Sequence, residues 1–326
     1  MGPETPAPAC ALSHPAPKRT GKARFGSPAP MRPRFWLSLA YQPVAQLVDL
    51  ARAAEDAGFH GVALPEHLVT PAKITSRYPY REDGVLDVRP ELQAPDPWVA
   101  IGTLAGATRT LRFVTSVYLL PLHELFSAAK AISTAACLSG GRVALGVGVG
   151  WMREEFELTG QDFATRGRRT DEMLAAMRRL FAGGMVEHHG EFFDFDPVQI
   201  SPVPEAPIPV YVGGESPAAL RRAAAADGWM SARICSPGEL ADVIGRLNAA
   251  RAIAGAVERP LRIFASADQP PAPDVVEAMS QAGVTDLTIS ARHALGPWHA
   301  SAADKRRSLH AFATRFRLRA PETGSE

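Results

Sequence analysis

The sequence has little of the features that mark several classes of protein. Its 326 residues include only three cysteines, Cys10, Cys137 and Cys235, whose wide spacing matches neither a disulfide framework nor a zinc site. The formal net charge of +1 is too small for the basic footprint of a nucleic-acid-binding protein. No run of about 18 apolar residues is present to span a membrane. We therefore expect a cytoplasmic protein that holds no metal and binds neither nucleic acid nor membranes.

What is present is ample material for a hydrophobic core, with 46% hydrophobic and 21% charged residues. Residues 1–32 are rich in Pro, Ala and Gly and lack hydrophobic periodicity, so we predict a disordered extension there. We expect residues 33–320 to form one domain and residues 321–326 to be a flexible tail.

Within that domain, short apolar segments alternate with helical patterns. Continuous apolar strands suit a sheet that is buried on both faces. The pattern predicts eight strands, over 34–40, 61–67, 111–121, 141–150, 207–215, 228–232, 261–267 and 285–290. An eightfold alternation of this kind predicts a (β/α)8 (TIM) barrel, with insertions after strand 2 (69–97) and after strand 4 (186–204, a small hairpin). Sites in such barrels lie at the carboxyl ends of the strands.

The fourth predicted strand places Gly146, Gly148 and Gly150 at alternate positions, directly before Trp151. The GxGxG spacing is not the GxGxxG of a dinucleotide fold, and no Gly-Lys-Ser/Thr follows to make a phosphate loop. Side chains at alternate positions of a strand point the same way. If that way is inward, the glycines leave the mouth empty for a flat ring; alternatively, they only relieve crowding in the barrel core.

Two other strand ends carry candidate site residues. Gly213 and Gly214 precede Ser216, which would begin a helix whose free N–H groups suit a phosphate, although an ordinary capped helix fits these residues equally well. The segment PEH, residues 65–67, ends strand 2 with His67, which could exchange a proton near neutral pH. A histidine at this position could also be an ordinary surface residue.

The order of these motifs resembles a known superfamily. The segments GVALPEH, VTSVYLLP, LSGGRVALGVGVGW, EEFELTGQDFATRGRRTDE and PIPVYVGGES, within residues 34–232, are similar to those of the luciferase-like monooxygenase superfamily. They resemble in particular its coenzyme F420-dependent oxidoreductases, and the loop segment YPYREDG fits that subgroup. The resemblance implies a TIM barrel that holds F420, or alternatively FMN, at its carboxyl-terminal mouth, and it implies a homodimer.

The resemblance also implies roles for individual residues. His67 and Glu154 would be catalytic, managing a proton while the cofactor carries a hydride. Thr115, Ser116 and Val117 would form a strand bulge behind the ring, where F420-using relatives have a non-prolyl cis peptide. The full set of implied cofactor-binding residues is Glu66, His67, Thr115, Ser116, Val117, Gly148, Gly150, Trp151, Gly213, Gly214 and Ser216. Trp151, Tyr78, Tyr80 and Trp98 would cover the ring, whereas His123 replaces an arginine usual in relatives.

The leading hypothesis is therefore an oxidoreductase that transfers a hydride between F420 and a small organic substrate. The first alternative is an FMNH2-dependent monooxygenase of the same superfamily. A second alternative is a non-catalytic flavin- or deazaflavin-binding protein, which predicts binding without turnover. A cofactor-free isomerase lacks support because no lysine or paired carboxylates stand at the strand ends.

Overall fold

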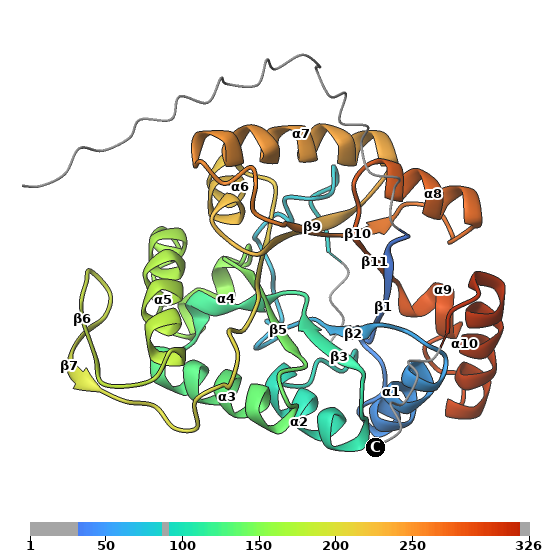
Figure 1. Cartoon of the computed structure of the whole chain (residues 1–326), viewed down its shortest axis with the longest axis horizontal. Coiled ribbons are helices and arrows are strands. Elements are labelled where there is room, and N and C mark those ends of the chain that lie inside the picture. Colours follow the sequence, from blue (N-terminus) through green and yellow to red (C-terminus); the bar gives the residue numbers. More distant parts are fainter. Residues whose placement is uncertain (1–31, 87–90, 320–326) are drawn as a thin grey trace, which may run out of the picture.

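The computed structural model describes residues 32–86 and 91–319, and its parallel strands form a closed barrel surrounded by helices (Figure 1). The strand order in the sheet is β3-β2-β1-β11-β10-β9-β8-β5-β4, and an additional pairing of β3 with β5 closes the ring. β3 pairs with the start of β5 and β4 with its end, so the two short strands share the third position of the barrel. The predicted eightfold barrel is confirmed.

The strands follow the predicted segments closely. The barrel strands are β1 (Arg34–Ser38), β2 (Gly61–Leu64), β3 (Arg112–Thr115), β4 (Tyr118–Leu119), β5 (Val143–Gly148), β8 (Val210–Gly213), β9 (Gly228–Cys235), β10 (Arg262–Ala267) and β11 (Asp286–Ile289). The one break is in predicted strand 3, which is interrupted between β3 and β4 at Ser116 and Val117. The peptide bond joining these two residues is cis, as the resemblance implies.

Helices connect the strands and cover the outside of the barrel. They are η1 (Val44–Gln46), α1 (Leu47–Asp56), α2 (Pro97–Ala107), η2 (Leu120–Leu122), α3 (Leu125–Leu138), α4 (Arg153–Leu158), α5 (Arg166–Phe181), α6 (Pro217–Ala224), α7 (Pro237–Ile253), α8 (Pro273–Gln281), α9 (Ala291–Leu295) and α10 (Ala302–Phe316). None of the helices within the described ranges is both long enough and apolar enough to cross a membrane.

Two hydrophobic layers hold this arrangement together. The larger one lies between the strands and the helices, as burial of both sheet faces requires. A smaller one fills the barrel interior with side chains from several strands: Trp36, Ala63, Val114, Ala144, Tyr211, Met230 and Phe264. The interior is therefore packed below the mouth, which leaves the carboxyl ends of the strands as the place for a site.

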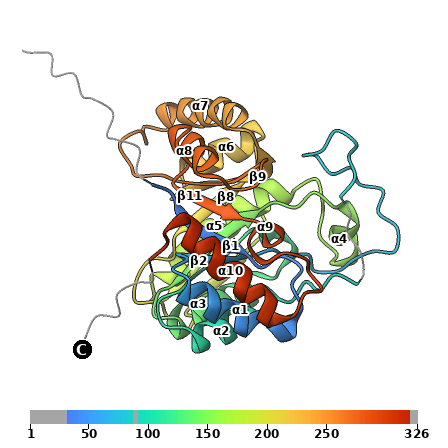
Figure 2. The same ribbon diagram turned by 90° about the vertical axis from the view of Figure 1, so that its right-hand side faces the viewer.

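Both predicted insertions are present. The second contains the expected hairpin, in which β6 (Val186–His189) pairs antiparallel with β7 (Asp194–Val198). Residues 69–86 and 91–97 of the first are described, and residues 69–86 lie on the same side of the molecule as α4 (Figure 2). The predicted tail at 321–326 and the predicted extension at 1–32, apart from Arg32, lie outside the described residues. Cys137 and Cys235 are free thiols.

Candidate active site

His67 follows β2 and is held by a buried carboxylate. Its Nδ1 lies 3.1 Å from Oε2 of Glu155, a side chain that is only 1% exposed. The other oxygen of Glu155 accepts a hydrogen bond from the backbone N–H of Leu68 at 2.9 Å. One oxygen of Glu155 bonds the ring of His67 and the other bonds the backbone of Leu68, the next residue in the same loop. Glu155 therefore fixes the orientation of the His67 ring. The contact at Nδ1 leaves Nε2 as the ring nitrogen available for chemistry.

Aromatic rings from the loop after β2 and from the turn after β5 gather beside this histidine. Trp151 packs edge-on against His67, with ring centroids 6.2 Å apart, and against Tyr78 at 5.2 Å. Tyr78 contacts Tyr80 at 5.5 Å, and its hydroxyl donates to the carbonyl of Ala232 at 3.2 Å. Burial, reinforced by Tyr80, raises the pKa of Tyr78 to about 12, so its hydroxyl stays protonated. Three of the four predicted ring-covering aromatics are therefore together.

The fourth, Trp98, lies elsewhere. It is 4% exposed at the start of α2 and packs against Tyr118 in the core. Asp96 caps this helix by accepting from the backbone N–H groups of Trp98 and Val99. Trp98 therefore contributes to the core and not to the mouth, so the prediction for this residue is wrong.

Glu66 is buried and serves the backbone behind the site. Its Oε2 accepts from the backbone N–H of Leu119 at 2.5 Å, and its Oε1 lies 2.9 Å from Nε2 of His123. His123 stacks on Tyr118, with centroids 4.3 Å apart and planes inclined by 10°. Glu66 therefore joins the loop after β2 to β4, through Leu119, and to His123 after η2. This position differs from the ring contact implied for Glu66, because both of its oxygens are already bonded within the protein.

The alternating glycines make room for protein and not for an empty mouth. A Cβ at Gly146 would lie 1.8 Å from the carbonyl oxygen of Thr115, and a Cβ at Gly148 would lie 2.5 Å from Cγ2 of Val117. Gly213, on the neighbouring strand, also borders Val117, whose Cγ1 would lie 3.0 Å from an added Cβ. The space left by the glycines is thus filled by Val117 and by the backbone of β3. The hypothesis of an open space beside the glycines needs this correction: a ring would lie against Val117.

Gly150 has a separate role at the end of β5. Its φ of +80° marks a turn, and an added Cβ would lie 2.7 Å from the ring of Phe156. Thr115 is fully buried and donates from its hydroxyl to the carbonyl of Gly146 at 2.7 Å. This hydrogen bond from Thr115 joins β3 to β5 at the level where the barrel interior ends.

Glu154 holds the loop after β2. Its Oε1 accepts from the backbone N–H of Thr75 at 2.6 Å, from the Thr75 hydroxyl at 2.6 Å and from the backbone N–H of Ser76 at 3.0 Å. Desolvation acts to raise its pKa, but these hydrogen bonds outweigh that effect and lower the pKa to about 2. A carboxylate that stays ionised this far below neutral pH is a poor proton carrier, so the structure favours a loop anchor over the predicted catalytic role.

The turn after β8 begins α6 and borders a basic cavity. Gly214 has a φ of +110°, and Ser216 caps the helix by accepting from the N–H of Ala219 at 3.2 Å. The backbone N–H of Glu215 is bonded to the hydroxyl of Tyr80. A cavity of about 570 Å³ adjoins this turn. It is lined by Pro79, Tyr80, Arg81, Glu82, Glu215, Ser216, Arg233 and Arg246.

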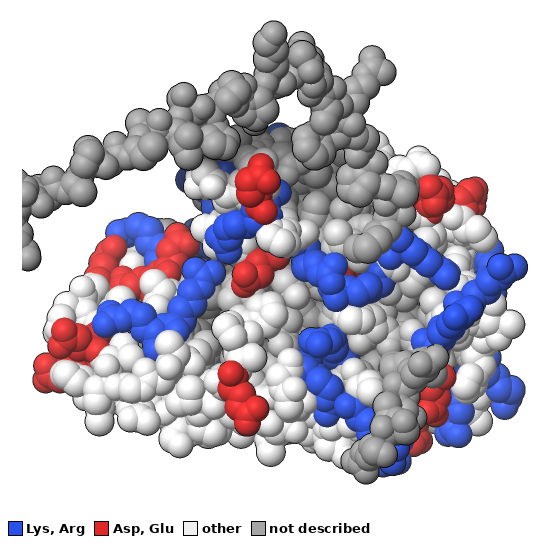
Figure 3. All heavy atoms as spheres, viewed as in Figure 1, with Lys and Arg blue, Asp and Glu red and all other residues white. Residues whose placement is uncertain are grey.

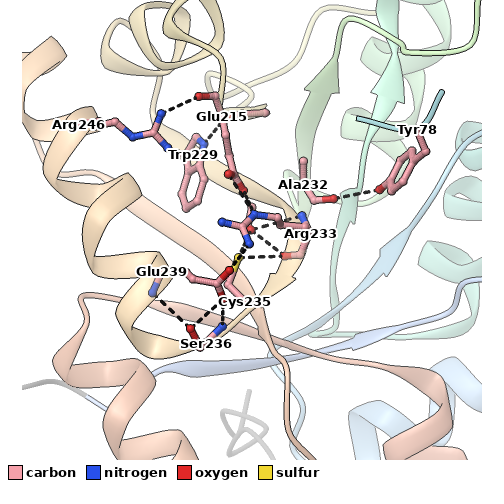
Figure 4. A network of polar contacts seen from close by, with 11 residues as sticks. Tyr78, Glu215, Trp229, Ala232, Arg233, Cys235, Ser236, Glu239 and Arg246 are labelled. Carbon is pink, nitrogen blue, oxygen red and sulfur yellow. Dashed lines mark hydrogen bonds and ion pairs between the residues drawn. The ribbon is translucent and has the colours of Figure 1, made fainter. Parts of the chain in front are cut away.

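Two of the lining arginines come from β9 and α7 (Figure 4). Arg233 is paired with Glu215 at 3.1 Å and with Glu239 at 2.5 Å. Arg246 donates one N–H to the carbonyl of Glu215 at 3.3 Å and makes no ion pair within the described residues. The Arg246 guanidinium therefore keeps donors free for an anion near the start of α6.

Sequence reasoning missed two residues of this site. Glu155 stands next to the predicted Glu154, and the pair EE gave no indication of which one faces His67. Arg246 lies 30 positions after Ser216, inside a helix with no motif of its own. Only the packing of α7 against α6 brings it to the turn.

Similarity to known proteins extends over most of the chain. The family description for luciferase-like monooxygenases matches residues 23–322. The chain belongs to this family. An uncharacterized member from Mycobacterium tuberculosis is 36% identical over 285 residues, which is 86% of this chain and 97% of that protein.

Another relative is the F420-dependent glucose-6-phosphate dehydrogenase of Gordonia bronchialis. It is 31% identical over 205 residues, and the match covers 61% of this chain and 54% of that enzyme. Among solved structures, an F420-dependent secondary alcohol dehydrogenase in complex with an F420–acetone adduct has a TM-score of 0.68 at 16% identity. That alignment covers 90% of this chain and all of the dehydrogenase, so the two share the same luciferase-like barrel fold.

Proposed function

We propose that this chain transfers a hydride between coenzyme F420 and a small organic substrate at the carboxyl-terminal mouth of the barrel. Membership of the family makes the chain an enzyme of the oxidoreductase class. Support for F420 comes from the 31% identical dehydrogenase, whose name states its dependence on this coenzyme. The observation that carries the proposal is the His67–Glu155 pair, a fixed and partly exposed imidazole beside Trp151 at the mouth.

The residues present fit a cofactor of this kind. A phosphate group is bound by cations and by the positive end of a helix, and Arg246 lies at the start of α6, where its guanidinium donates to the carbonyl of Glu215. The adjoining cavity of about 570 Å³ lies in the size range of cofactor sites. Val117 and Trp151 offer apolar surface for a planar ring.

The chain's own residues divide the remaining tasks. When bound, the deazaflavin supplies or accepts the hydride. Reduction of an acceptor such as a carbonyl also requires one proton on its oxygen, and oxidation of an alcohol releases that proton. His67 exchanges this proton at Nε2, while Glu155 holds Nδ1 and stabilises the positive charge of the protonated ring. Tyr78, Tyr80 and Trp151 exclude water from the reacting atoms.

An absorbance titration of the purified protein with F420 and, separately, with FMN tests the cofactor. We expect saturable binding of F420 and much weaker binding of FMN. Tight binding of FMN with no binding of F420 would instead support the alternative, an FMNH2-dependent monooxygenase.

The role of His67 is tested by His67→Ala, with His188→Ala as the matched control. His188 is likewise paired with a carboxylate, Glu172, but it belongs to the hairpin. We expect His67→Ala to abolish turnover while F420 affinity stays within a few-fold, and His188→Ala to change neither. If the unmodified chain binds F420 but turns over no substrate, the result would support the non-catalytic alternative.

The homodimer and the cytoplasmic location remain predictions, which size-exclusion chromatography and cell fractionation would test.

A further inference from the structure

The end of the barrel opposite the mouth carries a second cavity, of about 720 Å³. The start of β1, the turn after α1 and the residues that follow α10 form its walls. The lining residues are Arg32, Pro33, Arg34, Phe35, Gly58, Phe59, His60, Thr110, Arg317, Leu318 and Arg319. Four of these eleven described residues are arginines and none is a carboxylate, which is an unbalanced composition for a surface cavity.

Most of this charge is not neutralised. Arg34 is paired with the fully buried Asp286 at 2.7 Å. The guanidinium of Arg32 donates to the backbone carbonyl of Phe316, which satisfies a donor but cancels no charge. Arg317 and Arg319 are exposed and make no ion pair within residues 32–86 and 91–319. Three cations therefore face the cavity without an ion-pair partner in the described part of the chain.

Neighbouring strands add to the positive field. Arg112 and Arg262 are the first residues of β3 and β10, and parallel strands all begin at the same end of the barrel. Arg262 lies 3.8 Å from Asp286, so that one carboxylate is shared between Arg34 and Arg262. His60, in the cavity wall, responds to this field. Burial is the largest cause that lowers its pKa to about 3, and Arg34, Arg112 and Arg262 lower it further. In Figure 3, where this end of the barrel faces the viewer, Lys and Arg side chains gather at the centre and right.

We propose that this cavity binds a small anion that carries phosphate groups. The planar fork of arginine matches phosphate oxygens and is hydrated weakly enough to bind them directly. The cavity is large enough for a phosphorylated metabolite and lies at the opposite end of the barrel from Ser216 and Arg246. It is therefore a binding site separate from the proposed cofactor site.

Isothermal titration calorimetry of the full chain with inorganic pyrophosphate tests the proposal. The variant is Arg317→Gln/Arg319→Gln, which removes two exposed cations from the cavity. The matched control is Arg178→Gln/Arg179→Gln, which removes two exposed arginines from the last turn of α5. We expect the cavity variant to weaken pyrophosphate binding at least tenfold and the control to change it less than twofold.

A third variant separates this site from the mouth. Arg246→Gln, beside α6, is expected to leave pyrophosphate binding at the cavity unchanged. The proposal is overturned if pyrophosphate does not bind at millimolar concentration, if the cavity variant binds it as well as the unmodified chain, or if only Arg246→Gln weakens it. Tighter binding of a single-stranded oligonucleotide than of pyrophosphate would also overturn it, because the occupant would then be a nucleic acid. A thermal melt of each variant confirms that it is folded.

Discussion

Removing the Glu154 carboxylate should free the loop after β2 and leave the barrel intact. Each hydrogen bond to a charged acceptor contributes about 1.5–3 kcal/mol. Because Thr75 is exposed to solvent, we take about 2 kcal/mol for its two bonds and the Ser76 bond together. Glu154→Ala then lowers the free energy of local opening by that amount. Amide hydrogen exchange in peptides covering residues 69–80 should become about 30-fold faster.

The matched control for Glu154→Ala is Glu124→Ala. Glu124 caps α3 by accepting from the backbone N–H groups of Phe126 and Ser127, so Glu124→Ala removes a similar carboxylate from another place. It should accelerate exchange at the start of α3 and leave residues 69–80 unchanged. Unchanged exchange at 69–80 in Glu154→Ala, measured by mass spectrometry, would refute the reasoning that this carboxylate anchors the loop.

Three further predictions concern packing, pH and catalysis. Gly148→Ala should destabilise the protein by about 1–3 kcal/mol, because the new Cβ meets a methyl group of Val117. Gly102→Ala, in open space on α2, should instead stabilise the protein by about 0.5–1 kcal/mol. Thermal melts check both variants. His60 has a folded-state pKa of about 3, below its unfolded value near 6.5, so its contribution to stability is complete above pH 6.5 and is lost as the pH falls. Urea unfolding should therefore show a loss of about 2 kcal/mol between pH 7.5 and pH 5 that is absent in His60→Gln. Glu155→Gln should lower kcat about 10- to 150-fold and leave F420 affinity unchanged. If kcat and F420 affinity fall by the same factor, Glu155 does not act through His67.

The barrel was predictable because its signals are local. Apolar strand segments, helix patterns and glycine-rich ends follow one another along the chain, and eight such strand–helix units match a closed barrel better than a doubly wound sheet, which does not need eight. The position of His67 at the mouth followed from the same rule, since it ends a strand. The residues that surround it are set by packing between distant segments.

Adjacent helical residues show why the rest could not be predicted. Glu154 and Glu155 differ in direction by about 100° around α4, and only the docking of that helix decides which one meets His67. Likewise, alternation along β5 indicates which way Gly146 and Gly148 face, but not that Val117 arrives from another strand to fill the space. Arg246 reaches the α6 turn through contacts that no sequence motif records.

The loop after β2 also indicates where this enzyme can change during evolution. Thr75 is bound to α4, Tyr78 to β9 and Tyr80 to the turn after β8, so three separate parts of the mouth depend on six consecutive residues. Substitutions at these three positions disturb all of those connections together. Residues 81–83, by contrast, are exposed. Because Arg81 and Glu82 line the cavity beside α6, a library that varies 81–83 and keeps Thr75, Tyr78 and Tyr80 is the rational starting point for altering which ligand binds there.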